Sequence, residues 1–196
     1  TLDFSVTGGV STVPNMSNVQ VLNAEEYVQF HTEQNGGTVP DFIANYWDGE
    51  TDTDWTDQIF RNGTYQNYAI SASGGDEKVT YMLSANYLSQ EGIVKGEEYD
   101  KYSARIKVDY KPIDRVTVGL NLAPNYSTMG RNSHATDGGD WASLFAQASL
   151  MAPIVPIYRE DGTYSMNSDL VGALPIGNPL ETMRNYDYDS DLFRML

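Results

Sequence analysis

The chain has 196 residues, of which 27 are acidic and 12 basic, so its formal net charge is −15. This charge argues against nucleic acid as a partner, because phosphate binding needs a basic surface. The absence of cysteine excludes a disulfide framework and a thiolate metal site. The most apolar long run, residues 141–158, contains two prolines and several polar residues, so it predicts a helix followed by an extended segment rather than a membrane-spanning helix.

Both ends of the chain have the pattern of a β-strand. The sequence opens on TLDFSVTGGV, which already alternates between apolar and polar residues, and it closes on DLFRML, which is typical of a strand start. No signal peptide precedes the first stretch. We therefore expect the chain to be a fragment of a larger protein.

Five segments alternate at period two, as strands with one dry and one wet face do: residues 2–10, 67–73, 79–88, 101–111 and 116–126. In the last, Pro124 predicts a bulge or a strand end, because proline cannot donate to a ladder. The stretch KYSARIKVDYK is the clearest. Its dry face carries Tyr102, Ala104, Ile106, Val108 and Tyr110, and its wet face carries Lys101, Ser103, Arg105, Lys107, Asp109 and Lys111.

The connections between these segments alternate in length. In chain order the connections are long (residues 14–64), short (74–78), medium (91–98), short (111–115) and long (128–189). In an up-and-down meander this order puts every long connection on one side of the sheet. Transmembrane barrels have that asymmetry, with short periplasmic turns and long extracellular loops. The first long loop also predicts a short helix, with Asn23 and Glu26 as a capping box and Gly36 after its end.

The dry face has two possible neighbours, the core of a soluble sandwich or membrane lipid. Tyr102 and Tyr110 bracket an apolar row about 20 Å tall along the membrane normal, close to the height of a barrel's apolar band with its two aromatic girdles. Tyr81 and Tyr87 bracket a shorter row in the same way. Small outward residues such as Ala104, and the long cationic wet face, favour lipid.

The acidic stretch DGETDTDWTD is a candidate ion site, because Asp48, Glu50, Asp52 and Asp54 recur at every second position. However, Thr53 stands where a calcium-binding EF-hand loop needs glycine. A solvated acidic loop is therefore the favoured interpretation, and we predict no metal ligand and no cofactor.

The sequence predicts no catalytic residue. His31 and His134 are far apart, and the Ser133–His134 neighbours do not make a triad, which requires a meeting in space. Aromatic residues in the loops are more suggestive, since exposed rings can stack on sugars. Trp47, Trp55 and Trp141 are therefore candidate substrate or partner contacts, although most such residues pack within their own loop.

Several stretches, in this order, resemble the early barrel region of SusC/RagA-type TonB-linked outer-membrane proteins of the Bacteroidetes. They are VLNAEEYVQF, TDWTDQIFRNGTYQNYAISASGG, KVTYMLSANYLSQEGIVKG, YDKYSARIKVDYKPIDRVTVGLNLAPNYS and IGNPLETM, and together they cover nearly the whole chain. The resemblance implies a 22-stranded barrel with an internal plug in the bacterial outer membrane. It also implies a SusD-like surface lipoprotein as partner, energy from TonB, and oligosaccharides or peptides as imported substrates.

We therefore predict an all-β fold, an antiparallel up-and-down meander of about five strands that forms part of a transmembrane β-barrel, with short helices in long extracellular loops. Residues 1–196 would be the N-terminal part of the barrel, without the plug and the remaining strands. Tyr102, Ala104, Ile106, Val108 and Tyr110 would face lipid, whereas Lys101, Arg105, Lys107 and Asp109 would face the lumen. The alternative is a soluble, secreted β-domain that binds glycans through exposed aromatics.

Overall fold

The computed structural model describes residues 1–13, 21–132, 143–185 and 187–195. The chain divides into two compact units. The first, here called the sheet unit, comprises Thr1–Thr12, Asn62–Arg131 and Tyr188–Leu196. The second, the loop unit, comprises Val13–Arg61 and Asn132–Asp187, which means that it is built from the two long connections.

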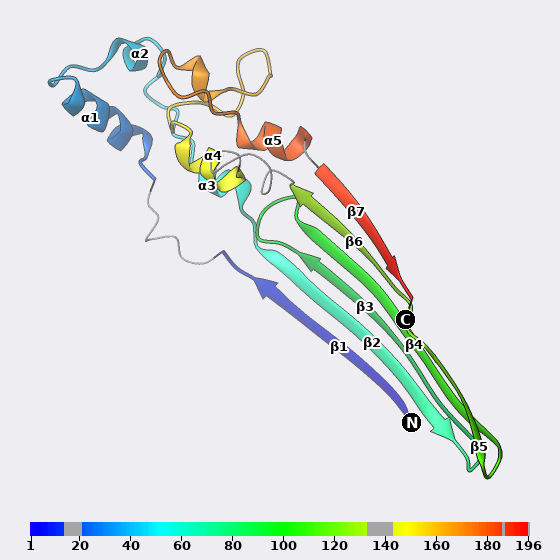
Figure 1. Cartoon of the computed structure of the whole chain (residues 1–196). Helices are drawn as coiled ribbons and strands as arrows, with labels where there is room; N and C mark the ends of the chain where they lie inside the picture. The colour runs from blue at the N-terminus through cyan, green and yellow to red at the C-terminus, as the bar shows by residue number, and fades with distance from the viewer. Residues whose placement is uncertain (14–20, 133–142, 186, 196) are drawn as a thin grey trace. The chain divides into compact units, whose positions relative to one another are not determined.

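The sheet unit is a single antiparallel sheet (Figure 1). The strand order is β1-β2-β3-β4-β6-β7, and β5 also pairs with β4. This arrangement confirms the predicted all-β meander. The strands are β1 (Leu2–Ser11), β2 (Gly63–Gly75), β3 (Val79–Glu91), β4 (Glu98–Ile113), β5 (Val116–Leu122), β6 (Asn125–Asn132) and β7 (Asp187–Arg194).

Strands β5 and β6 form one interrupted arm against β4. Pairing stops at Leu122 and resumes at Asn125 in an unchanged register. Pro124 lies in the gap, where it has no N–H to give, yet its carbonyl accepts a hydrogen bond from the Ala104 N–H at 3.0 Å. The predicted interruption is confirmed. This break, together with β7, raises the number of described strands from the expected five to seven.

The short connections lie at one end of the strands. Asp76 organises the β2–β3 turn, because its Oδ1 accepts hydrogen bonds from the N–H groups of Lys78 and Val79, both at 2.8 Å. At the opposite end Ser11 pairs with Gly63, so the first long connection leaves and rejoins the sheet at the same level. The strand register therefore places the short β2–β3 turn and the first long connection at opposite ends of the sheet.

The loop unit contains short helices: α1 (Ala24–Gln34), α2 (Asp41–Ala44), α3 (Trp55–Ile59), α4 (Leu144–Leu150), η2 (Asn167–Asp169) and α5 (Pro179–Asn185). The capping box predicted for α1 is present. Asn23 Oδ1 accepts from the Glu26 N–H at 2.9 Å, and Glu26 Oε2 accepts from the Asn23 N–H at 3.1 Å. Gly36 follows the helix with a φ of 71°. No helix in the described ranges has the length and apolar character needed to cross a membrane.

The buried core lies in the loop unit. Trp55 at the start of α3 is only 2 % exposed, and its indole N–H donates to the Ala152 carbonyl at 3.1 Å. Thr53 ties the same two segments together, with its N–H on the Pro153 carbonyl at 2.8 Å and its hydroxyl on the Val155 carbonyl at 2.9 Å. The two long connections therefore share one core. Its buried members are Ala24, Ile43, Trp55, Ile59, Ala148, Met151, Ala152, Ile154, Val155, Leu170 and Ile176.

Candidate functional site

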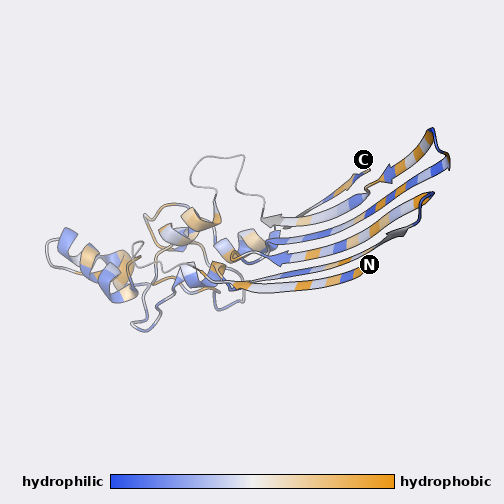
Figure 2. Ribbon diagram, turned by 90° about the horizontal axis from the view of Figure 1, so that it is seen from below, coloured by the Kyte–Doolittle hydropathy of each residue, from blue (hydrophilic) through white to orange (hydrophobic). Residues whose placement is uncertain are grey.

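One face of the sheet is apolar and uncovered within the described residues. The strand register aligns apolar residues across neighbouring strands, and Figure 2 shows the resulting alternation of hydrophobic and hydrophilic positions along each strand. Leu2 is 72 % exposed, and Ile106 in the middle of β4 is 37 % exposed. One complete row consists of Leu2, Ala72, Leu83, Ile106 and Leu122.

A row of stacked tyrosines borders this apolar face on the side of the long connections. Tyr68, Tyr87, Tyr102 and Tyr126 pair in register on four neighbouring strands. The ring centroids are 6.2 Å apart for Tyr68 and Tyr87, 4.7 Å apart for Tyr87 and Tyr102, and 6.4 Å apart for Tyr102 and Tyr126. The Tyr87 hydroxyl donates to Asp100 Oδ1 at 2.8 Å. Asp100 lies two residues before Tyr102 on β4, nearer to the end of the sheet that carries the long connections. The rings thus join an apolar band to a polar rim, as interfacial tyrosines do.

The height of the apolar face is close to that of the apolar band of a transmembrane barrel. Tyr102 and Tyr110 are separated by eight residues of β4, about 26 Å along the strand and about 20 Å along the normal of a barrel with tilted strands. Ile106 lies halfway between them. Near the short turns, the Tyr81 ring lies over Gly74, where an added Cβ would stand 2.6 Å from the tyrosine oxygen. An aromatic ring therefore covers the glycine backbone at that end.

The opposite face of the sheet is polar and hydrogen-bonded across strands. Arg105 Nε donates to Asn121 Oδ1 at 3.3 Å, and Lys107 Nζ lies 3.4 Å from Asp109 Oδ2. Asn86 on β3 donates to Asn67 on β2 at 2.6 Å. The register places Lys101, Arg105, Lys107 and Asp109 together on this face, and Tyr102, Ala104, Ile106, Val108 and Tyr110 on the apolar one. Which face meets lipid and which the lumen stays a prediction.

Two of the three candidate tryptophans, Trp47 and Trp55, pack within the loop unit. The indole N–H of Trp47 donates to the Thr51 carbonyl at 2.8 Å, and its ring packs against the core. Trp55 is part of that core, so a substrate could touch it only if the core opened. Trp141 lies outside the described residues. A contact between these residues and a substrate or partner stays an untested prediction.

Three carboxylates of the acidic stretch, those of Asp48, Asp52 and Asp54, accept hydrogen bonds from backbone N–H groups. Asp48 Oδ1 accepts from two N–H groups, including that of Thr51 at 2.7 Å, and these bonds lower the pKa of Asp48 to about 2. Asp52 accepts from the Ala24 N–H at the start of α1, and Asp54 caps α3. Among the described residues no group of three or more histidine, cysteine or acidic side chains is arranged to hold a metal ion.

His31 occupies a packing position among aromatic rings. Its ring centroid is 4.4 Å from that of Tyr27, 5.4 Å from that of Phe30 and 5.5 Å from that of Phe42. Burial lowers the pKa of His31. His134 lies outside the described residues, so no geometry relates the two histidines.

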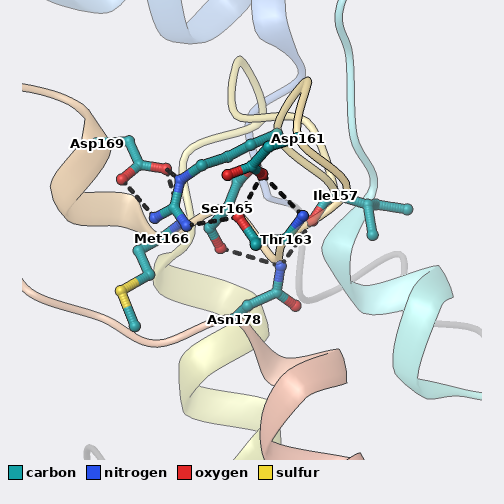
Figure 3. A network of polar contacts seen from close by, with 8 residues as sticks. Ile157, Asp161, Thr163, Ser165, Met166, Asp169 and Asn178 are labelled. Atoms are coloured by element: carbon teal, nitrogen blue, oxygen red, sulfur yellow. Dashed lines mark hydrogen bonds and ion pairs between the residues drawn. The ribbon is translucent and has the colours of Figure 1, made fainter.

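Sequence reasoning missed a braced hairpin in the second long connection, at Ile157–Ser165 (Figure 3). Arg159 forms a bidentate ion pair with Asp169, at 2.9 and 2.8 Å, and Asn178 supports the hairpin from below. The signal was present in the segment YREDGTY, whose Asp161 and Gly162 are typical turn residues between two tyrosines. A single bridge between two residues is too short to produce a readable period-two pattern.

An antiparallel sheet with one uncovered apolar face, a tyrosine border and a polar opposite face defines a segment of a transmembrane β-barrel wall. Solved structures agree with this fold. The chain is similar to the RagAB peptide transporter, with a TM-score of 0.69 and 18 % identity over 93 % of this chain and 24 % of that one. The RagAB peptide importer in the open-open state gives a TM-score of 0.67 and 19 % identity, over 91 % of this chain and 23 % of that one.

Curated relatives identify the family. The chain is 30 % identical to TonB-dependent receptor P3 of Formosa agariphila over 170 residues, which cover 86 % of this chain and 16 % of the relative. It is 26 % identical to TonB-dependent receptor SusC of Bacteroides thetaiotaomicron, over 82 % of this chain and 15 % of the relative. No protein-family model matches. The chain belongs to the SusC/RagA-type TonB-dependent receptors, and it spans about a sixth of the length of these curated relatives.

Proposed function

We propose that this chain forms the early wall strands and two extracellular loops of an outer-membrane barrel that imports oligosaccharides or peptides. In this proposal residues 1–196 are the N-terminal part of the barrel, and the plug and remaining strands lie in other parts of the complete receptor. The loop unit would meet a SusD-like surface lipoprotein, and TonB would supply energy through a part of the receptor outside this sequence.

The uncovered apolar face of the sheet is the observation that carries the proposal. A soluble domain buries such a face, because contiguous exposed apolar surface is rare on soluble proteins and favours association. Here the apolar rows end at a tyrosine border, and their height fits the apolar band of a barrel. Lipid is therefore the covering we propose, with Tyr102, Ala104, Ile106, Val108 and Tyr110 toward the bilayer. The soluble glycan-binding alternative loses its support.

The polar face suits a water-filled interior or a plug. Lys101, Arg105, Lys107 and Asp109 would line the lumen, where charged side chains keep their hydration and polar partners such as Asn121 for Arg105 and Asp109 for Lys107. The proposed role is transport rather than catalysis. The relatives are named as receptors, and His31 is surrounded by aromatic rings rather than by a nucleophile.

Single cysteines offer a direct test, because this chain contains none. In a complete receptor without other cysteines, Leu83→Cys and Ile106→Cys should resist a water-soluble maleimide in outer membranes, because a thiol in the hydrocarbon layer stays protonated and out of reach of the reagent. Ser84→Cys and Ser103→Cys, on the polar face of the same strands, should react with that reagent. Val171→Cys, on a loop-unit residue that is 81 % exposed, should react with an impermeant reagent on intact cells.

The pattern of labelling decides the outcome. Reaction of Ile106→Cys with the water-soluble reagent at the rate of Ser103→Cys would show that both faces meet water, and the barrel-wall proposal would fail. Protection of Val171→Cys until the cells are broken open would place the loop unit on the periplasmic side. Reaction of an unfolded receptor in urea serves as the control for intrinsic reactivity.

A further inference from the structure

The hairpin at Ile157–Ser165 is held rigidly from two sides. On one side Arg159 donates two hydrogen bonds to Asp169, and this bidentate geometry fixes the guanidinium plane. On the other side the fully buried Asn178 donates to the carbonyls of Ile157 and Ser165, both at 3.0 Å, so that one amide clamps both arms. Figure 3 shows these contacts converging on the hairpin. The backbone is therefore preorganised.

The hairpin at Ile157–Ser165 carries a pair of aromatic rings. Tyr158 and Tyr164 face each other across the hairpin, with ring centroids 5.1 Å apart and planes tilted by 34°. The neighbouring Tyr164 phenol raises the pKa of Tyr158. Tyr158 is nevertheless 53 % exposed. Rigid, exposed tyrosines give a large contact area at a low cost in side-chain entropy, which is why binding surfaces favour them.

Polar groups lie on the same hairpin. Glu160 and Asp161 are exposed at its tip. Their carboxylates are acceptors, and the tyrosine hydroxyl groups can both donate and accept, so the hairpin offers polar groups as well as an aromatic surface.

We propose that Tyr158 and Tyr164, with Glu160 and Asp161 at the tip of the same hairpin, form a stacking subsite for an uncharged pyranose ring of a saccharide. The C–H face of a pyranose is apolar and packs on an aromatic ring, while its hydroxyl groups at the rim need both donors and acceptors. Two side chains on one hairpin offer far less than the roughly 800 Å² that each partner contributes to a stable protein interface, so a small ligand suits them better.

The charge of the loop unit selects an uncharged sugar. Its two segments contain sixteen acidic residues and three arginines, a net charge of −13. One of those arginines, Arg159, is already paired with Asp169. A field of this sign repels uronic-acid and sulfated chains, and slows their approach more strongly at low salt. The inference rests on the proposed transport function and names a substrate class for it.

The test uses the complete receptor, purified in detergent, on an array of neutral oligosaccharides, uronic-acid and sulfated oligosaccharides, and short peptides. The wild type should bind a neutral saccharide. Tyr158→Ala and Tyr158→Leu should weaken that binding about tenfold or more, the loss expected for one stacking contact. Tyr158→Phe keeps the ring and should retain most of the affinity. Phe30→Ala removes an exposed aromatic from α1 of the same unit and serves as the matched control.

Three results would overturn the subsite: a wild type that binds only peptides, one that binds only anionic sugars or no saccharide at all, and a Tyr158→Leu variant that binds as well as the wild type. Because leucine preserves apolar bulk, that variant separates loss of the ring from loss of the fold. The cysteine-labelling experiment does not involve these residues, so the transport proposal and the subsite can fail independently.

Discussion

The two units of this chain differ in whether they bury their apolar side chains. The loop unit buries Trp55, Ile154 and Val155 in a core of its own and carries a net charge of −13. The sheet unit contains eleven acidic and nine basic residues, a net charge of −2, and leaves its apolar rows exposed. Among the described residues, the loop unit thus buries its apolar side chains whereas one face of the sheet stays uncovered, and this contrast supports the proposal that lipid covers that face.

The difference also explains how the two units are stabilised. Strands of the sheet unit are fixed by their ladders and by cross-strand pairs such as Tyr87 and Tyr102, whose contributions are modest one by one. The loop unit depends on packing around a few large side chains and on capped helix ends. Substitutions should therefore damage one unit without the other, and three experiments, in order of expected effect, test that separation.

Removing Trp55 should have the largest effect, and only on the loop unit. Trp55→Ala leaves a cavity in the shared core and deprives the Ala152 carbonyl of its donor, a loss of about 3–5 kcal/mol. We expect faster amide hydrogen exchange in α3 and α4, with heat-modifiable gel mobility of the receptor unchanged. Trp55→Phe keeps most of the ring and should cost about 1 kcal/mol. A barrel that also fails to assemble in Trp55→Ala would contradict the independence of the units.

A charge on the apolar face should damage only the sheet unit. Ile106→Arg places a guanidinium near the proposed bilayer midplane, which costs about 2–4 kcal/mol. Assembly of the receptor, followed by heat-modifiable mobility, should fall sharply. Ser103→Arg on the same strand but on the polar face is the matched control, and it should assemble nearly as well as the wild type. Equal loss in both variants would mean that the faces are assigned wrongly.

The smallest expected effect is on the stability of the loop unit at acid pH, through Asp48. The pKa of Asp48 is lowered to about 2, first by the backbone N–H of Thr51 and then by its hydroxyl. A carboxyl whose pKa is lower in the folded state stabilises that state above its unfolded pKa near 4 and loses this contribution as the pH falls toward 2. Asp48→Asn should therefore reduce the acid sensitivity of the loop unit between pH 4 and 2, measured by hydrogen exchange. The sheet unit should titrate identically in both proteins, and an unshifted NMR titration of Asp48 would refute the prediction.

Most of the sheet could be predicted because its signal is local. Alternation fixes which residues share a face, and Pro124 marks the interruption of the last hairpin arm, since both depend on neighbouring residues alone. The helix after Asn23 could be predicted from a capping box, whose two residues, Asn23 and Glu26, are three positions apart. β7 was only partly visible, because it returns to the sheet after a long connection and too little of its pattern precedes the end of the chain.

The loop core could not be predicted, because its contacts join residues about 100 apart. Nothing near Trp55 indicates that its N–H will meet the carbonyl of Ala152, so an exposed aromatic and a core anchor look alike in the sequence. The same holds for Asn178, whose side chain spans two hairpin arms. The tyrosine row is an intermediate case, since each tyrosine was visible but its alignment over four strands required the register.

The bonds that join Thr53 and Trp55 to the segment at 152–155 have a consequence for exchanging parts between receptors. A graft that transfers only the first long connection moves one of the two segments that these bonds join. The donors of Thr53 then lack the Pro153 and Val155 carbonyls that they meet in this chain. The smallest transplantable module is therefore both connections together, moved as one cassette with the strand ends at Ser11, Gly63, Asn132 and Asp187 as its four junctions. Chimeras cut in that way should inherit a donor's recognition properties on a recipient's barrel.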